Sequence, residues 1–143
     1  CVLCGLVVRQ LIQGWKPETA LDAARVEFVG LYERGTEAIH FRHVLEDELA
    51  ALPEGDIVST GYVLHTLHAS LWCLLTTSSF RECVLKAVNL GGDTDTTGCV
   101  AGGLAGVHYG VSAIPADGIH SRPRHAEVES LFNRFADLIS PSL

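Results

Sequence analysis

Apolar side chains recur at helical spacing along most of the chain, and no segment shows the strict alternation typical of a half-buried strand. The pattern therefore predicts an all-α fold of about six to eight helices. The expected helices run over residues 2–13, 17–35, 36–52, 62–75, 79–90 and 127–139, with a further glycine-rich helix that ends at residue 110. Because residues 62–75 and 100–109 are the most continuously apolar, we expect them to be among the most buried.

Small residues mark the glycine-rich helix. Gly98, Gly102, Gly106 and Gly110 recur every four residues, with Ala101 and Ala105 beside them. Residues four apart share one face of a helix. The spacing therefore predicts a flat face against which another element packs closely.

Several residues predict where helices begin and end. Pro17 suits a helix start, where its missing N–H is harmless. Ser79, followed three residues later by Glu82, predicts a capping box. Residues 53–56 predict a turn, residues 114–118 a break in the chain, and residues 120–125 a polar loop.

Two carboxylates, Asp93 and Asp95, stand two residues apart directly before the glycine-rich helix, with hydroxyls at Thr94, Thr96 and Thr97 among them. Hard divalent cations prefer oxygen ligands of this kind. The positive end of a helix also favours carboxylates beside it. The pattern indicates a metal-binding turn. The alternative is that Asp93 or Thr94 only caps the helix, a role that needs one of these side chains and leaves the second acid unexplained.

Two common loop motifs do not fit this turn. An EF-hand loop that began at Asp93 would need a glutamate at its twelfth position, where the chain has the apolar Leu104. A phosphate-binding P-loop needs a lysine after its glycines, and this segment has none.

The stretch Gly91–Gly98, with its continuation to Gly110, resembles the C-terminal signature of the ADP-ribosylglycohydrolase family, which includes the hydrolase that removes ADP-ribose from dinitrogen reductase. Two further stretches are similar to that family. They are Gly61-Tyr62-Val63 with His65-Thr66-Leu67, Ala69 and Trp72, and Ser79-Phe80 with Ala87-Val88-Asn89-Leu90. The similarity is close over residues 55–115 and loose over residues 1–30.

The resemblance implies a compact orthogonal helical bundle and a hydrolase with two Mg²⁺ ions, Mn²⁺ being a possible substitute. It assigns metal ligands to Asp93, Asp95 and Thr96, and makes Asp93 and Asp95 the catalytic candidates. It also implies that Gly61 and Tyr62 bind near the adenosine end of ADP-ribose. The expected partner is an ADP-ribosylated protein or a small molecule that contains ADP-ribose.

The chain departs from the family pattern at its start. The family also has a Thr-Asp-Asp run and a glutamate among its metal ligands, in its N-terminal half, and no Thr-Asp-Asp occurs here. The chain also contains no methionine. We therefore expect residues 1–143 to be the C-terminal part of one helical domain, inactive until the missing N-terminal half is supplied.

Composition narrows the remaining choices. A net charge of −7 argues against nucleic acid as the main partner. The chain has no apolar run long enough for a membrane span and no recognisable signal peptide, so we expect a cytoplasmic protein.

The cysteines and histidines suit structural roles better than metal binding. Cys1 and Cys4 form one C-x-x-C without a second pair at zinc-site spacing. Cys73, Cys83 and Cys99 lie on apolar helical stretches, where a free cysteine acts as a small hydrophobe. His40 and His43, like His65 and His68, are three residues apart, whereas zinc helices more typically use a spacing of four.

Two functions remain open from the sequence. The first is a magnesium-dependent hydrolase that cleaves the glycosidic bond between ADP-ribose and its acceptor. The second is a non-catalytic helical module with a metal-binding or structural role.

Overall fold

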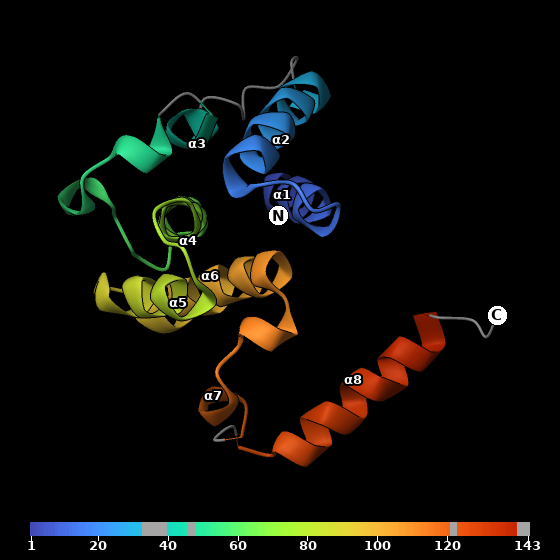
Figure 1. Ribbon diagram of the computed structural model, residues 1–143. Helices are drawn as coiled ribbons and strands as arrows, with labels where there is room; N and C mark the ends of the chain where they lie inside the picture. Colours follow the sequence, from blue (N-terminus) through green and yellow to red (C-terminus); the bar gives the residue numbers. More distant parts are fainter. Residues whose placement is uncertain (33–39, 46–47, 121–122, 140–143) are drawn as a thin grey trace. The chain divides into compact units, whose positions relative to one another are not determined.

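The chain is helical wherever it has regular structure. The computed structural model describes residues 1–32, 40–45, 48–120 and 123–139. Its helices are α1 (Val2–Ile12), α2 (Pro17–Tyr32), α3 (Arg42–Leu45), α4 (Val63–Leu75), α5 (Phe80–Asn89), α6 (Thr94–Tyr109), α7 (Ala116–His120) and α8 (His125–Ile139) (Figure 1). Within these residues there is no strand, which confirms the all-α prediction.

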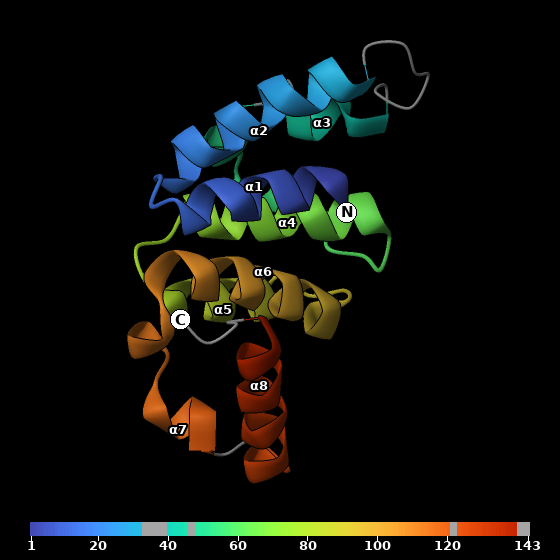
Figure 2. The same cartoon turned by 90° about the vertical axis from the view of Figure 1, so that its right-hand side faces the viewer.

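Two units divide the chain, Cys1–Ala113 with helices α1 to α6 and Ile114–Leu143 with α7 and α8. In the first unit α4 contacts α2, α5 and α6, while α1 packs on α2 and α6. Figure 2 shows the resulting layers, with α2 and α3 above α1 and α4, and α5 and α6 below them. In the described residues no helix is both long and apolar enough to cross a bilayer.

Burial of the two most apolar stretches is confirmed only in part. α4 buries eight of its residues, from Thr66 to Leu74. Its start is exposed, because Tyr62 and Val63 retain 53% and 58% of their accessible surface. In α6 the buried residues are Thr97, Ala101, Leu104 and Ala105. α6 therefore buries one face, and only Ala101, Leu104 and Ala105 of residues 100–109 are among the buried residues.

The glycine face of α6 is the surface that packs against α5. A methyl group placed on Gly98 would lie 2.8 Å from Val88 Cγ1, one on Gly102 would lie 3.5 Å from Val84 Cγ2, and one on Gly106 would lie 3.9 Å from Phe80 Cε2. Gly110 ends the helix with a φ of 79°. The four-residue glycine period thus lets α5 and α6 approach closely, as the sequence predicts, most tightly at the start of α6.

Most predicted helix ends are found where expected. Pro17 is the first residue of α2. Ser79 caps α5, since its hydroxyl oxygen accepts the Glu82 N–H at 3.2 Å. The reciprocal half of the capping box differs from the prediction, because the Glu82 carboxylate accepts the N–H of Ser78, at 3.0 Å, instead of that of Ser79.

Three predictions about the elements need correction. A single helix over residues 36–52 is wrong: the described part holds α3, a non-helical Glu48 and a 3-10 turn at Leu49–Ala51, and residues 36–39 lie outside the described structure, as does Gly35. The break at residues 114–118 is shorter than expected, because Ala116 begins α7. In the loop expected at 120–125, residues 121 and 122 lie outside the described structure, and α8 begins at His125.

Residues Ser59–Tyr62, which we call the strap, tie the first turn of α6 to the start of α4. The Asp93 N–H donates to the Ser59 carbonyl at 2.8 Å. The buried Ser59 and Thr97 hydroxyls are 2.9 Å apart. Gly92 makes the approach possible, since it has a φ of 68° and a Cβ there would lie 1.9 Å from the Ser59 oxygen. The strap therefore fixes the position of Asp93, the first acid of the turn.

We expect Gly103→Ala to stabilise the protein by about 1 kcal/mol, because nothing lies within 4 Å of a methyl group at that helical position. Gly98→Ala removes the same helix penalty but drives a methyl group into Val88, so it should be neutral or destabilising. Thermal unfolding measures both changes. In a Val88→Ala background Gly98→Ala should become stabilising, and a failure to do so would contradict the close packing of α5 on α6.

Gly91→Ala and Gly92→Ala form a matched pair, because both glycines have positive φ but only Gly92 lies against another backbone. Gly91→Ala should cost about 1–2 kcal/mol of stability from φ alone. Gly92→Ala should cost more than about 3 kcal/mol, because it also displaces Ser59 and breaks its bond to Asp93. Urea unfolding of the two variants decides the matter, and equal losses would refute the described contact.

Candidate metal centre

Asp93 begins α6 as its N-cap. Its Oδ1 accepts the Thr96 N–H at 3.3 Å, and its own carbonyl accepts the Thr97 N–H at 3.1 Å. The capping role considered from the sequence is therefore present. This capping bond uses Oδ1, so capping alone does not account for Oδ2 of Asp93 or for the second acid, Asp95.

Three side-chain oxygen donors gather at this turn. The Thr96 side chain, followed by the Asp95 side chain and the Thr96 N–H, holds the pKa of Asp93 below its ordinary value. Groups that shift the pKa of a carboxyl in this way must lie close to it. Asp93, Asp95 and Thr96, the three ligands predicted from the sequence, are thus neighbours in space. Asp95 and Thr96 are also exposed.

Gly61 of the strap faces Oδ2 of Asp93. A Cβ built on Gly61 would lie 2.6 Å from Oδ2 and 3.7 Å from Cγ. Any larger residue would therefore press directly on the carboxylate. The missing side chain lets the strap backbone lie against Oδ2. Two carboxylates and a hydroxyl on one turn are the kind of oxygen ligands that a hard divalent cation prefers.

This turn supplies only part of a coordination shell. Among the described residues no group of three or more histidine, cysteine, aspartate or glutamate side chains is placed to hold a metal ion. The turn has two carboxylates, and its third donor is the Thr96 hydroxyl. Mg²⁺ takes six ligands and keeps several waters among them, so this donor set needs waters or further protein oxygens to complete it.

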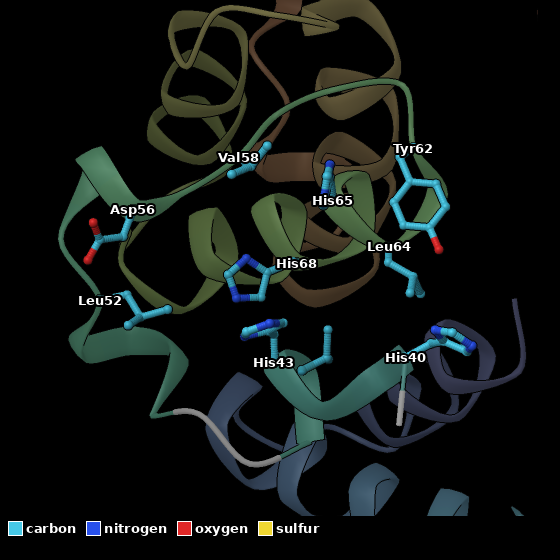
Figure 3. A pocket seen from close by; sticks show the side chains of 10 residues that line it. His40, His43, Leu52, Asp56, Val58, Tyr62, Leu64, His65 and His68 are labelled. Atoms are coloured by element: carbon cyan, nitrogen blue, oxygen red, sulfur yellow. The ribbon is translucent and has the colours of Figure 1, made fainter. Parts of the chain in front are cut away.

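Two pockets flank the strap. One, which we call the apolar pocket, has a volume of about 510 Å³ and includes Gly61 and Thr96 in its lining. The other, the histidine pocket, has a volume of about 580 Å³ and includes Tyr62 and Asp56 (Figure 3). Gly61 and Tyr62, the two predicted substrate-binding residues, therefore line neighbouring pockets, and Gly61 is the one beside the acid turn.

The two histidine pairs noted in the sequence line the same pocket. His40, His43, His65 and His68 all contribute to the histidine pocket (Figure 3). Nδ1 of His65 lies 2.7 Å from the Thr60 hydroxyl oxygen. Sequence spacing did not show that the two pairs meet, because His40 and His43 belong to a segment separated from α4 by more than one turn.

The cysteines differ in how far they are buried. Cys73 and Cys83 are buried, and burial is the main cause that raises the pKa of the Cys73 thiol to about 12. Cys99 is exposed, so its predicted role as a core hydrophobe is wrong. Cys1 and Cys4 line the apolar pocket near Thr96, a placement that the sequence did not suggest.

Sequence reasoning missed the residues that hold the turn in place. Ser59 binds both Asp93 and Thr97, and Thr60 links the strap to α4. One signal was available: two consecutive glycines before an N-cap aspartate indicate positive φ and a close backbone approach. The partner of that approach, Ser59, lies far away in sequence and has no local signature.

A family model matches nearly the whole chain, and several known proteins are similar to part of it. The sequence model of the ADP-ribosylglycohydrolase family matches residues 1–142. The ADP-ribosylarginine hydrolase Tri1 of Pseudomonas putida (strain GB-1) is 36% identical over 81 residues, 57% of this chain and 22% of the relative. The ADP-ribosyl-[dinitrogen reductase] glycohydrolase of Rhodospirillum rubrum is 45% identical over 58 residues, 41% of this chain and 20% of the relative.

A vertebrate relative is also similar. The ADP-ribosylhydrolase ARH3 of Danio rerio is 42% identical over 55 residues, 38% of this chain and 15% of the relative. In each case the matched part is about a fifth or less of the relative's length. Since the family match extends over nearly every residue, the chain belongs to the ADP-ribosylglycohydrolase family.

Proposed function

We propose that this chain is the metal-holding C-terminal part of a magnesium-dependent ADP-ribosyl hydrolase. The observation that carries the proposal is the cluster of Asp93, Asp95 and Thr96 at the first turn of α6, where Gly61 lets the strap backbone lie against Oδ2 of Asp93. A carboxylate needed only as a helix cap leaves the second acid, Asp95, unexplained. Membership of the ADP-ribosylglycohydrolase family supports the reaction class.

Asp93, Asp95 and Thr96 are the residues that would hold Mg²⁺, with two ions expected in the whole enzyme and Mn²⁺ as a substitute. A bound divalent cation supplies Lewis-acid chemistry: it orients hydroxyl groups and lowers the pKa of water. The Asp93 N-cap bond to Thr96 and the strap hold the donor atoms in place beforehand. Such positioning is where a hydrolase of this kind gains much of its rate.

The proposed substrate is an ADP-ribosylated protein or a small molecule that contains ADP-ribose. Cleavage of its glycosidic bond develops positive charge on the ribose. Two carboxylates on one turn stabilise such charge, so Asp93 and Asp95 are our catalytic candidates. In this proposal Gly61 and Tyr62 contact the adenosine end, and the exposed ring of Tyr62 is available for that contact.

The missing donors must come from elsewhere. We propose that they precede Cys1, in a part of the protein that the chain does not contain, and that residues 1–143 alone do not release ADP-ribose. The match to about a fifth of each relative supports this part of the proposal. A cytoplasmic location stays a prediction.

Asp95→Asn should reduce ADP-ribose release by more than about a hundredfold, because it removes a charged donor from the turn. The assay compares ADP-ribosylated arginine and serine peptides, with Mg²⁺ and with chelator, in the full-length protein and in residues 1–143. The helices should stay folded, since Asp95 is exposed. Asp117→Asn, an exposed acid of α7, is the control and should retain full activity.

Three outcomes count against parts of this proposal. Turnover by residues 1–143 alone would refute the need for further donors. Turnover unaffected by chelator would refute the metal. No turnover by the full-length protein on either substrate would favour the non-catalytic helical module instead.

Gly61→Ala should lower Mg²⁺ affinity by about 10- to 100-fold, because its methyl group displaces the Asp93 carboxylate without removing a donor. Gly61 does not have positive φ, so alanine adds no backbone strain. Calorimetric titration of Mg²⁺ into the full-length variant gives the affinity. Gly55→Ala, where nothing lies within 4 Å of the added methyl group, is the matched control. Equal affinities in the two variants would show that Oδ2 of Asp93 does not bind the metal.

A further inference from the structure

Thr60 is the residue through which the strap is attached to α4. Its hydroxyl oxygen lies 2.7 Å from Nδ1 of His65 and accepts the Tyr62 N–H at 3.3 Å. Its carbonyl accepts the Thr66 hydroxyl at 3.2 Å. Thr60 and Tyr62, the residues on either side of Gly61, are therefore held in place by the first turn of α4, through Thr60.

His65 contacts the strap in a second way. Its ring meets the Tyr62 ring edge-on, with centroids 5.1 Å apart and an interplanar angle of 80°. Such T-shaped pairs are favourable between aromatic rings. The imidazole therefore supports the side chain of Tyr62 and, through Thr60, the backbone of Tyr62. Figure 3 shows His65 and Tyr62 on the same side of the histidine pocket.

The direction of the Thr60–His65 bond depends on the tautomer of His65, and the contacts of Thr60 are compatible with a hydroxyl that donates to Nδ1. A threonine hydroxyl has one proton to donate and two lone pairs that accept. The Tyr62 N–H uses one lone pair of Thr60. Among the described contacts of this hydroxyl, Nδ1 of His65 is the acceptor available for its proton. The neutral imidazole then carries its own proton on Nε2.

We propose that His65 is a positioning residue of the hydrolase, which acts by accepting the Thr60 hydroxyl proton at Nδ1. This bond holds the strap so that Gly61 stays beside Asp93 and Tyr62 stays in place for the substrate. The inference rests on the proposed function, because it assigns Gly61 and Tyr62 to the substrate site. The contacts described for His65 are with Thr60 and Tyr62 of the strap.

Three substitutions separate positioning from simple packing. His65→Asn places an amide oxygen at the position of Nδ1, so it still accepts from Thr60. His65→Gln places its amide near the position of Nε2 and leaves Thr60 without this acceptor. Thr60→Val keeps the shape of Thr60 and removes its hydroxyl. His108→Gln, on α6 and away from the strap, is the control.

Steady-state kinetics of the full-length protein on ADP-ribosylated arginine peptide tests the proposal. His65→Gln and Thr60→Val should each raise KM about five- to tenfold, the effect of one lost hydrogen bond, with kcat within about twofold. His65→Asn and His108→Gln should keep the wild-type KM. The Thr60→Val/His65→Gln double variant should be no worse than either single variant, because both remove the same bond. Equal KM values for the Asn and Gln variants at His65 would overturn the proposal.

A second measurement does not depend on turnover. Nitrogen-15 NMR of the histidine side chains, at a pH where the ring is neutral, distinguishes the two tautomers of His65. The signal of His65 is the one that disappears in the His65→Asn variant. The proposal requires a proton on Nε2 and none on Nδ1, and a proton on Nδ1 would overturn it. If the wild-type protein does not hydrolyse the substrate, the proposed function fails, and the tautomer and its response to Thr60→Val still decide the contact of His65.

Discussion

The site depends on one close approach between two backbones, that of Gly92 to the carbonyl of Ser59. Because Gly92 has no side chain and a positive φ, the Asp93 N–H can reach the Ser59 oxygen. That bond sets where α6 begins, and the Ser59–Thr97 hydroxyl pair keeps the first turn against the strap. The acids of the turn and the glycine beside them are therefore positioned by the same few contacts.

The rest of the fold supplies rigidity behind this approach. α6 is held from one side by the strap and from another by α5, whose side chains fill the space above the glycine face. α4 carries the other end of the strap and is the most buried helix of the first unit. The turn that we propose as a metal site is thus anchored to two packed helices, an arrangement that would preorganise its oxygens for a cation.

The sequence predicted those features of the fold that depend on residues close together in the chain. The glycine period, the Ser79 cap and the Pro17 helix start each involve residues within about one or two turns of one another, so they can be read from spacing. The helix expected over residues 36–52 was wrong because its apolar positions suit more than one arrangement. Val44 and Leu49 are both buried, but they are carried by separate short helical segments with Glu48 between them.

The sequence indicated the candidate ligands of the site but not the residues that hold the turn in place. The preference of hard cations for oxygen pointed to the acids and hydroxyls of this turn. The family resemblance then selected Asp93, Asp95 and Thr96, which the structure brings close together. Gly61 was named only through a family resemblance, and the structure adds a physical reason, the close approach of the strap backbone to Oδ2 of Asp93. Ser59, Thr60 and His65 were not predicted as a network, because their bonds depend on how the strap meets two helices, which no periodicity along the chain encodes.

The central claim, that this turn is a metal site, is tested most directly by a crystal structure of the full-length protein with Mn²⁺, recorded near the manganese absorption edge. The account predicts an anomalous peak bound by Asp93, Asp95 and Thr96, with Oδ2 of Asp93 as a ligand atom. A peak only in the histidine pocket, or none at the turn at millimolar Mn²⁺, would contradict it.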